Sequence, residues 1–163
     1  FMFNLKIDFF FKSIFIISCI AIISAYLIEY VFGHQPCNLC LIERIPYILS
    51  IILITIHYFY NKNEKLIIIL LIIIFIFSSI ISFYHFGIEQ DFFKESVVCK
   101  LRDISDIMSK DEILKSLNER TISCRDVTFR IFGLSLTSIN IFISLIITFI
   151  LFKIYITHEK KKF

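Results

Sequence analysis

The chain has 163 residues, of which 58% are hydrophobic and 20 are phenylalanine, and its formal net charge is only +3 at pH 7. Its mean hydropathy of +0.83 is far above that of an ordinary soluble protein. This length fits one membrane domain and leaves no room for a soluble enzyme beside it. A weak positive charge without a basic stripe argues against a nucleic-acid-binding protein.

Four apolar runs are each long enough to cross a bilayer, which takes roughly 20 residues of helix. They predict transmembrane helices at about residues 13–32, 43–60, 66–87 and 131–152. Isoleucine dominates these runs, but their length and lack of charge favour helices over strands, because a helix satisfies its own backbone hydrogen bonds in lipid. We therefore expect an all-α integral membrane protein, a four-helix bundle that forms one domain over residues 1–163.

The connections between the predicted helices differ in character. A tight polar turn at residues 61–65 makes the second and third helices antiparallel neighbours. Two further loops, at about residues 33–42 and 88–130, carry four of the five cysteines.

The long second loop has an amphipathic pattern of its own. Its apolar residues Leu101, Ile104 and Ile107 share one helical face, and Ser109–Glu112 has the spacing of a capping box that opens another short helix. We expect short amphipathic helices that lie on the membrane surface, and a small soluble cap packed on itself is the alternative.

The distribution of positive charge predicts the orientation. The two termini and the short turn hold eight of the 17 lysines and arginines in a much shorter stretch of chain than the other nine occupy. This density predicts that both termini lie in the cytoplasm and that the two cysteine loops lie on the opposite side of the membrane. The cysteines agree, because disulfides persist outside the reducing cytosol. A cleaved signal peptide is the alternative for the first run, but Glu29 and Tyr30 stand where small residues would be expected.

Cys37–Cys40 has the C-x-x-C spacing of a redox dithiol, a spacing that zinc and haem sites also use. Haem attachment needs a histidine where Leu41 stands, and a zinc site would need two more ligands, which Cys99 and Cys124 could supply. A structural disulfide is the remaining alternative. Redox work is favoured because the pair precedes a helix, whose N–H groups lower a thiol pKa. Arg44, one turn beyond Cys40, would stabilise a thiolate and the negative charge that develops on a quinone.

Cys99 and Cys124 form the second pair, in an exposed and charged loop. A disulfide there should be accessible and reducible and thus suited to exchange, although a structural loop staple is the alternative. Cys19, deep in the first predicted helix, is interpreted as a small buried apolar residue.

Three motifs follow one another across nearly the whole chain: Pro36–Cys40 with Glu43-Arg44 and Pro46-Tyr47, then Tyr84–Glu89, then Phe132–Ser135 followed by Asn140. Together they resemble the DsbB family of membrane disulfide bond formation proteins. The chain departs from the family in one detail, since the family commonly has glutamine where Glu43 stands. The length of the second loop leaves open whether the resemblance is to a general oxidase or to a substrate-dedicated branch.

The resemblance implies a quinone-dependent protein thiol:disulfide oxidoreductase of the bacterial inner membrane that generates periplasmic disulfides. The Cys99/Cys124 pair would oxidise a periplasmic thioredoxin-fold partner of the DsbA type, with Cys99 in the mixed disulfide. Cys124 would then exchange with Cys37 and free the Cys40 thiolate to react with ubiquinone or menaquinone.

The resemblance also implies a quinone site. Arg44 would hold and polarise the quinone, and His85 would join the same pocket with a proton-handling or hydrogen-bonding role. Glu29 is interpreted as a satisfied interfacial carboxylate, with a proton relay as the alternative. We expect no metal in this site.

Three other functions fit parts of the sequence. A b-type cytochrome would use His57 and His85, which the antiparallel helices place too far apart for one iron. A membrane scaffold with structural disulfides would not need Cys40. A relative of vitamin K epoxide reductase is disfavoured, because its quinone-side C-x-x-C follows the loop cysteines in sequence.

Overall fold

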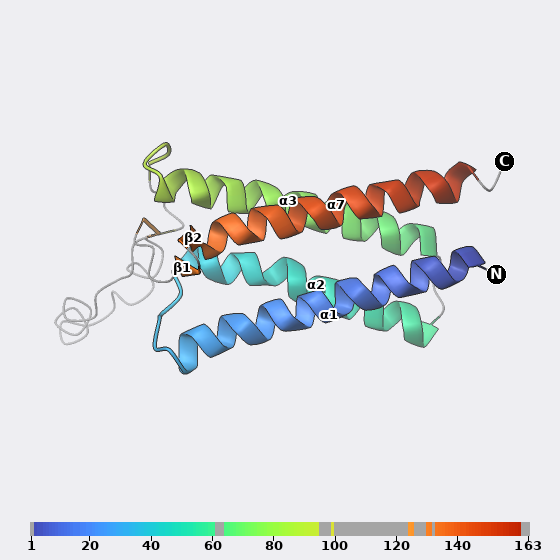
Figure 1. The fold of residues 1–163 in the computed structure, drawn as a ribbon, viewed down its shortest axis with the longest axis horizontal. Helices are drawn as coiled ribbons and strands as arrows, with labels where there is room; N and C mark the ends of the chain where they lie inside the picture. Colours follow the sequence, from blue (N-terminus) through green and yellow to red (C-terminus); the bar gives the residue numbers. More distant parts are fainter. Residues whose placement is uncertain are drawn as a thin grey trace, which may run out of the picture.

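The computed structural model describes residues 2–60, 64–94 and 133–160, together with Cys99, Cys124, Arg125, Arg130 and Ile131. These residues form four long helices and one short hairpin (Figure 1). The helices are α1 (Met2–Tyr30), α2 (Asn38–Tyr60), α3 (Glu64–Glu89) and α7 (Leu136–Lys160), and the strands are β1 (Arg130–Ile131) and β2 (Leu134–Ser135). All four helices are long and apolar enough to cross a membrane, which confirms the predicted four-helix membrane bundle.

The helices lie side by side and alternate in direction (Figure 1). Helix α3 packs against α2 and α7, and α1 packs against α2. Both chain ends lie at one end of the bundle, whereas the start of α2, the end of α3 and the start of α7 lie at the other (Figure 1). The second of these ends carries the cysteine-bearing segments, and we refer to it as the cysteine end.

The bundle interior is apolar along its length and is fully buried at Phe11, Ile54, Phe75 and Leu151. Isoleucine and phenylalanine side chains also cover the outward faces, which suits a surface that contacts lipid. Because lipid tails are as apolar as these side chains, helices in a membrane are held together by close packing and by polar contacts.

Two pairs of buried serines supply such polar contacts. The Oγ atoms of Ser18 and Ser50 lie 2.8 Å apart and join α1 to α2, and those of Ser78 and Ser144 lie 3.0 Å apart and join α3 to α7. All four serines are completely buried. Their small side chains let the backbones approach, and each hydroxyl has a partner across the helix interface.

Helix α2 begins earlier than the predicted residue 43, so that Cys40 lies in its first turn. The cause is Cys37, which occupies the N-cap position. Its carbonyl accepts the N–H of Leu41 at 3.2 Å, and its sulfur accepts the N–H of Cys40 at 3.3 Å. A capping side chain normally binds the third helical N–H in this way.

Helix α7 begins later than the predicted residue 131, because the β1–β2 hairpin occupies the preceding residues. Gly133 has a φ of 83° between the strands, a conformation that glycine adopts without strain. Ser135 then caps the helix by accepting the N–H of Ser138 at 3.2 Å. The amphipathic helices expected within residues 101–117 lie outside the described residues.

Candidate functional site

The two cysteines of the C-x-x-C motif lie at the mouth of α2. Cys37 is buried and Cys40 is half-buried, and their sulfur atoms are 2.7 Å apart. This separation lies between the length of an S–S bond, about 2.05 Å, and ordinary van der Waals contact, so a small movement closes the disulfide. Hydrogen bonding from Cys40 holds the pKa of the Cys37 thiol well below its usual range, burial opposes this effect, and His85 adds to it.

The second cysteine pair lies against the first. Cys99 and Cys124 form a disulfide with Cα atoms 5.9 Å apart. Cys124 and Cys37 belong to one buried cluster with Leu39 and Ile88, against which Cys40 and Cys99 pack. The structure thus brings together the four cysteines that the sequence singled out.

The end of α3 supports this cluster. The backbone N–H groups of Phe92 and Phe93 both bind the Gly87 carbonyl, and the Phe93 ring stacks on Tyr84 with centroids 5.7 Å apart. A Cβ atom at Gly87 would meet the Phe93 ring at 2.1 Å, so this position requires glycine while the ring stays in place. Beyond the turn, Asp91 forms a 2.6 Å ion pair with Arg125, the residue that follows Cys124.

His85 lies within the bundle beside Cys37 and is only 2% exposed. Its Nε2 atom is 3.6 Å from the Cys37 sulfur, and its Nδ1 atom is 2.9 Å from Oε1 of Glu43. A carboxylate, an imidazole and a thiol therefore stand in line. This order can move a proton to or from Cys37 and orient the ring.

A network of polar side chains from α2, α3 and α7 surrounds this line. Glu43 Oε2 accepts a hydrogen bond from Asn140 at 3.1 Å, and Asn140 also binds Ser82 and Tyr47. Thr137 donates to Oε1 of Glu89 at 2.7 Å, which in turn lies 4.0 Å from Nε2 of His85. The sequence analysis assigned no role to Glu89 or Thr137. The signal for Glu89 was its position as an acidic residue one helical turn after His85, and Thr137 had no comparable signal.

Arg44 lies on the opposite side of the helix mouth, toward α1. Its Nη1 atom forms a 2.6 Å ion pair with Glu29, and its guanidinium lies over the Tyr26 ring at 5.1 Å from the centroid. Glu29 thus has the partner that a satisfied interfacial carboxylate would need, and its interpretation as one stays a prediction. Cys19, which was expected to be buried, is only partly buried.

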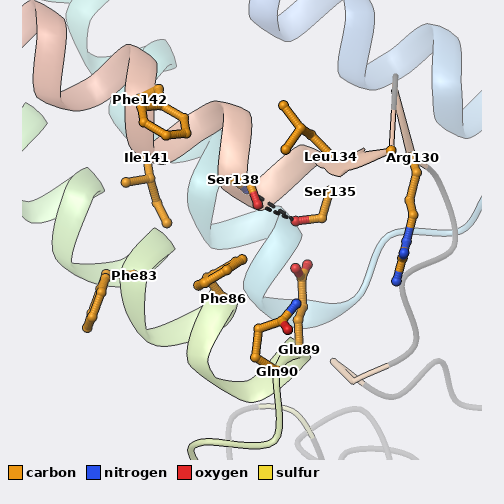
Figure 2. Close-up of a pocket in the computed structure, with 11 residues that line it drawn as sticks. Phe83, Phe86, Glu89, Gln90, Arg130, Leu134, Ser135, Ser138, Ile141 and Phe142 are labelled. Atoms are coloured by element: carbon orange, nitrogen blue, oxygen red, sulfur yellow. Dashed lines mark hydrogen bonds between the residues drawn. The ribbon is translucent and has the colours of Figure 1, made fainter.

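A pocket of about 470 Å³ opens next to the site, between the end of α3 and the start of α7. Phe83, Phe86 and Phe142 supply much of its apolar lining, and Ser138 and Glu89 are among its polar residues. The Glu89 carboxylate points from the end of α3 toward the start of α7 (Figure 2). Its Oε2 atom is buried and has no hydrogen-bond partner among the described residues.

The geometry also tests two of the alternative functions. His57 packs against Phe11 near the start of α1, with ring centroids 5.1 Å apart, so it lies far from His85 at the cysteine end. The two histidines cannot share one haem iron. A zinc site built from all four loop cysteines does not fit this structure either, because Cys99 and Cys124 are bonded to each other.

Comparisons with known proteins agree with this arrangement. A family model described as "Disulfide bond formation protein DsbB" matches residues 8–154 and so includes all four clustered cysteines. The chain is also 30% identical over 131 residues to the uncharacterized protein RP370 of Rickettsia prowazekii (strain Madrid E), a match that covers 79% of this chain and 76% of that relative. No solved structure gives a significant match.

Proposed function

Because the chain belongs to the DsbB family of disulfide bond formation proteins, we propose that it reoxidises a DsbA-type thioredoxin-fold protein and passes the electrons to a membrane quinone. The observation that carries this proposal is the single cluster formed by both cysteine pairs. Thiol–disulfide exchange requires a thiolate to reach the sulfur that it attacks, and packing in one cluster meets this requirement.

The proposed relay begins at the Cys99–Cys124 disulfide. A partner thiolate bonds to the Cys99 sulfur, and Cys124 leaves as a thiolate. Cys124 then attacks Cys37 in the closed Cys37–Cys40 disulfide, which releases the Cys40 thiolate. The partner's second thiol then attacks the partner sulfur that is bonded to Cys99. This attack releases the Cys99 thiolate and leaves the partner with its own disulfide. Cys99 finally attacks Cys124, which restores their bond and leaves Cys37 and Cys40 reduced.

The reduced pair must then lose two electrons for its own disulfide to close again. A bound ubiquinone or menaquinone supplies this oxidising capacity, because it accepts two electrons and two protons as it becomes a quinol. Arg44 fits such a ligand, since it lies one turn after Cys40 on the same helical face. Glu29 and Tyr26 fix the guanidinium through Nη1 and the ring face, and an arginine has further N–H donors for a quinone carbonyl.

Of the two roles expected for His85, we propose proton handling. Its Nε2 atom faces Cys37, and its Nδ1 atom is held by Glu43. We assign it the task of stabilising the Cys37 thiolate when Cys124 leaves and of receiving a thiol proton.

The cell location follows from the same arrangement. The cysteines lie at one end of the bundle and both termini lie at the other (Figure 1). An exchangeable disulfide belongs outside the reducing cytosol, so we place the cysteine end in the periplasm and both termini in the cytoplasm.

A trapping experiment tests the proposed function. In membranes from Cys124→Ser cells, the free Cys99 thiolate should attack the disulfide of the oxidised partner, which bonds Cys99 to the partner and releases the partner's second thiol. Acid quenching followed by alkylation blocks that thiol, so that it cannot displace Cys99 again. The matched control is Cys99→Ser, which leaves Cys124 as the lone thiol and should not accumulate the same adduct. Mass spectrometry after purification without reductant identifies the attached protein. Absence of any thioredoxin-fold adduct at Cys99 would contradict the proposal.

A further inference from the structure

We propose that the reduced site binds a zinc-type divalent cation through Cys37, Cys40 and His85, and that this binding arrests the relay. The two sulfur atoms and one ring nitrogen all lie within 4.8 Å of one another. The arrest rests on the proposed function, whereas the binding does not.

The distances match what zinc requires. Bond lengths of about 2.3 Å to sulfur and about 2.05 Å to nitrogen, at a tetrahedral angle, place a sulfur and a nitrogen ligand about 3.6 Å apart and two sulfurs about 3.8 Å apart. The observed distance from Cys37 Sγ to His85 Nε2 is 3.6 Å. The two sulfurs, now 2.7 Å apart, must separate, and reduction of the pair permits this movement.

The surroundings of His85 are those of a metal-binding histidine. Such a histidine usually donates its other ring N–H to a carboxylate, which orients the ring and presents the lone pair of the binding nitrogen. Glu43 holds Nδ1 at 2.9 Å, and this leaves Nε2 directed at the sulfurs. Thr137 also reaches Nδ1 at 3.3 Å.

Glu89 lies next to the three ligands and, in the described part of the chain, carries the nearest carboxylate to His85 Nε2 apart from Glu43. Its side chain is 6% exposed, its Oε1 lies 4.0 Å from His85 Nε2, and its Oε2 has no hydrogen-bond partner among the described residues. A buried carboxylate oxygen without a partner is costly unless a cation or donor satisfies it. Glu89 also lines the pocket of Figure 2, so an ion in that pocket would lie near this carboxylate.

The consequence for the relay is a redox-selective block. Binding displaces the thiol proton that the Cys37/Cys40 pair still holds, this proton passes to solvent, and no electrons are transferred. Both sulfurs are then held by the metal and cannot close their disulfide. The oxidised chain has no thiolates to offer, so only the reduced form is captured.

Metal titration of the full chain in detergent tests the binding. A variant with Cys19, Cys99 and Cys124 changed to serine leaves only the Cys37/Cys40 dithiol, and it is reduced and freed of reductant before Zn²⁺ or Co²⁺ is added. We expect one ion per reduced chain, with the Co²⁺ absorption of a tetrahedral thiolate site, and no comparable binding by the oxidised chain. Equal binding by the oxidised chain would overturn the site.

Histidine variants separate this site from simple dithiol chelation. His85→Ala should weaken binding by at least tenfold and change the Co²⁺ spectrum, whereas His57→Ala, at the other end of the bundle, should do neither. If His85→Ala does not fold, Glu43→Gln should weaken binding by tenfold or more through the ring that it orients. Unchanged affinity in the folded variant would refute the role of His85.

An activity measurement tests the block separately. Zn²⁺ should stop quinone-dependent turnover, and a chelator should restore it. Because the titration uses neither partner nor quinone, it stands even if the oxidase function fails. Conversely, full turnover with bound Zn²⁺ would overturn the proposed arrest of the relay but not the binding of the metal.

Discussion

The Nε2 atom of His85 lies 3.6 Å from the sulfur of Cys37, although 48 residues separate them in the chain. The contact joins the end of α3 to the mouth of α2, and Glu43 completes it from within α2. It makes Cys37 the better stabilised thiolate of the reduced pair, because Cys37 also accepts hydrogen bonds from the thiol and the backbone N–H of Cys40.

This stabilisation predicts the pH dependence of Cys37 alkylation. Since its pKa is lowered, Cys37 in the reduced chain should remain a thiolate well below the usual thiol pKa of about 8.5, and its alkylation rate should be nearly flat between about pH 7 and about pH 9. Cys40→Ala removes the largest cause of the shift, and His85→Ala removes a smaller one, so each should restore a rate that rises with pH. Peptide mass spectrometry of the alkylated chain measures this directly.

The same pKa shift links stability to pH. Because the pKa of the Cys37 thiol is lower in the folded chain than in the unfolded chain, its ionisation adds to the free energy of unfolding of the reduced protein. This contribution is complete above the unfolded-state pKa, and it disappears as the pH falls through the folded-state pKa. An ordinary titration of Cys37 in the reduced chain would contradict both expectations.

Cys40 should be indispensable for turnover. Cys40→Ser removes the sulfur that must close the disulfide with Cys37, so quinone-dependent oxidation of a reduced protein substrate should fall to the background rate. Cys19→Ser is the matched control, because Cys19 lies within α1 and outside the cluster, and it should retain activity. Normal turnover by Cys40→Ser would instead favour a scaffold with structural disulfides.

Loss of Arg44 should weaken the use of quinone. Arg44→Ala removes a charge-assisted hydrogen bond, and we expect the apparent KM for quinone to rise by about tenfold. Steady-state kinetics with a soluble quinone measures this, and Lys12→Ala provides the control, since Lys12 is an exposed cation paired with Asp8 near the other end of α1. Unchanged kinetics in Arg44→Ala would remove Arg44 from the quinone site.

Gly87→Ala should destabilise the chain because its methyl group collides with the Phe93 ring. Overpacking of this kind costs about 1–3 kcal/mol, which thermal unfolding in detergent can detect. Phe93→Ala removes the obstacle, and in that background Gly87→Ala should become neutral or stabilising, because alanine is the better helix former. A similar loss in both backgrounds would place the cause elsewhere.

The sequence predicted the four helices because a membrane span leaves a long and nearly uncharged run. It also singled out the four cysteines and Arg44 from their local patterns, and His85 through the family resemblance. The start of α2 was placed too late, because hydropathy alone does not reveal that Cys37 caps a helix with its sulfur.

The polar network around His85 was beyond prediction from the sequence. Glu43, Thr137 and Glu89 reach this ring from three different helices, and their contacts depend on how each helix is rotated in the bundle. Apolar residues surround all of these helices, so no amphipathic stripe marks the inward face. Glu89 carried the least signal, as a single acidic residue at the end of a hydrophobic run.

The placement of both chain ends away from the cysteines has a practical consequence (Figure 1). A fluorescent protein or affinity handle fused to either end would sit a membrane's thickness from the sulfur chemistry. Such a fusion could report the amount and orientation of the protein in living cells without obstructing the docking of a partner. Handles inserted near the β1–β2 hairpin, by contrast, would crowd the mouth of the pocket beside Glu89.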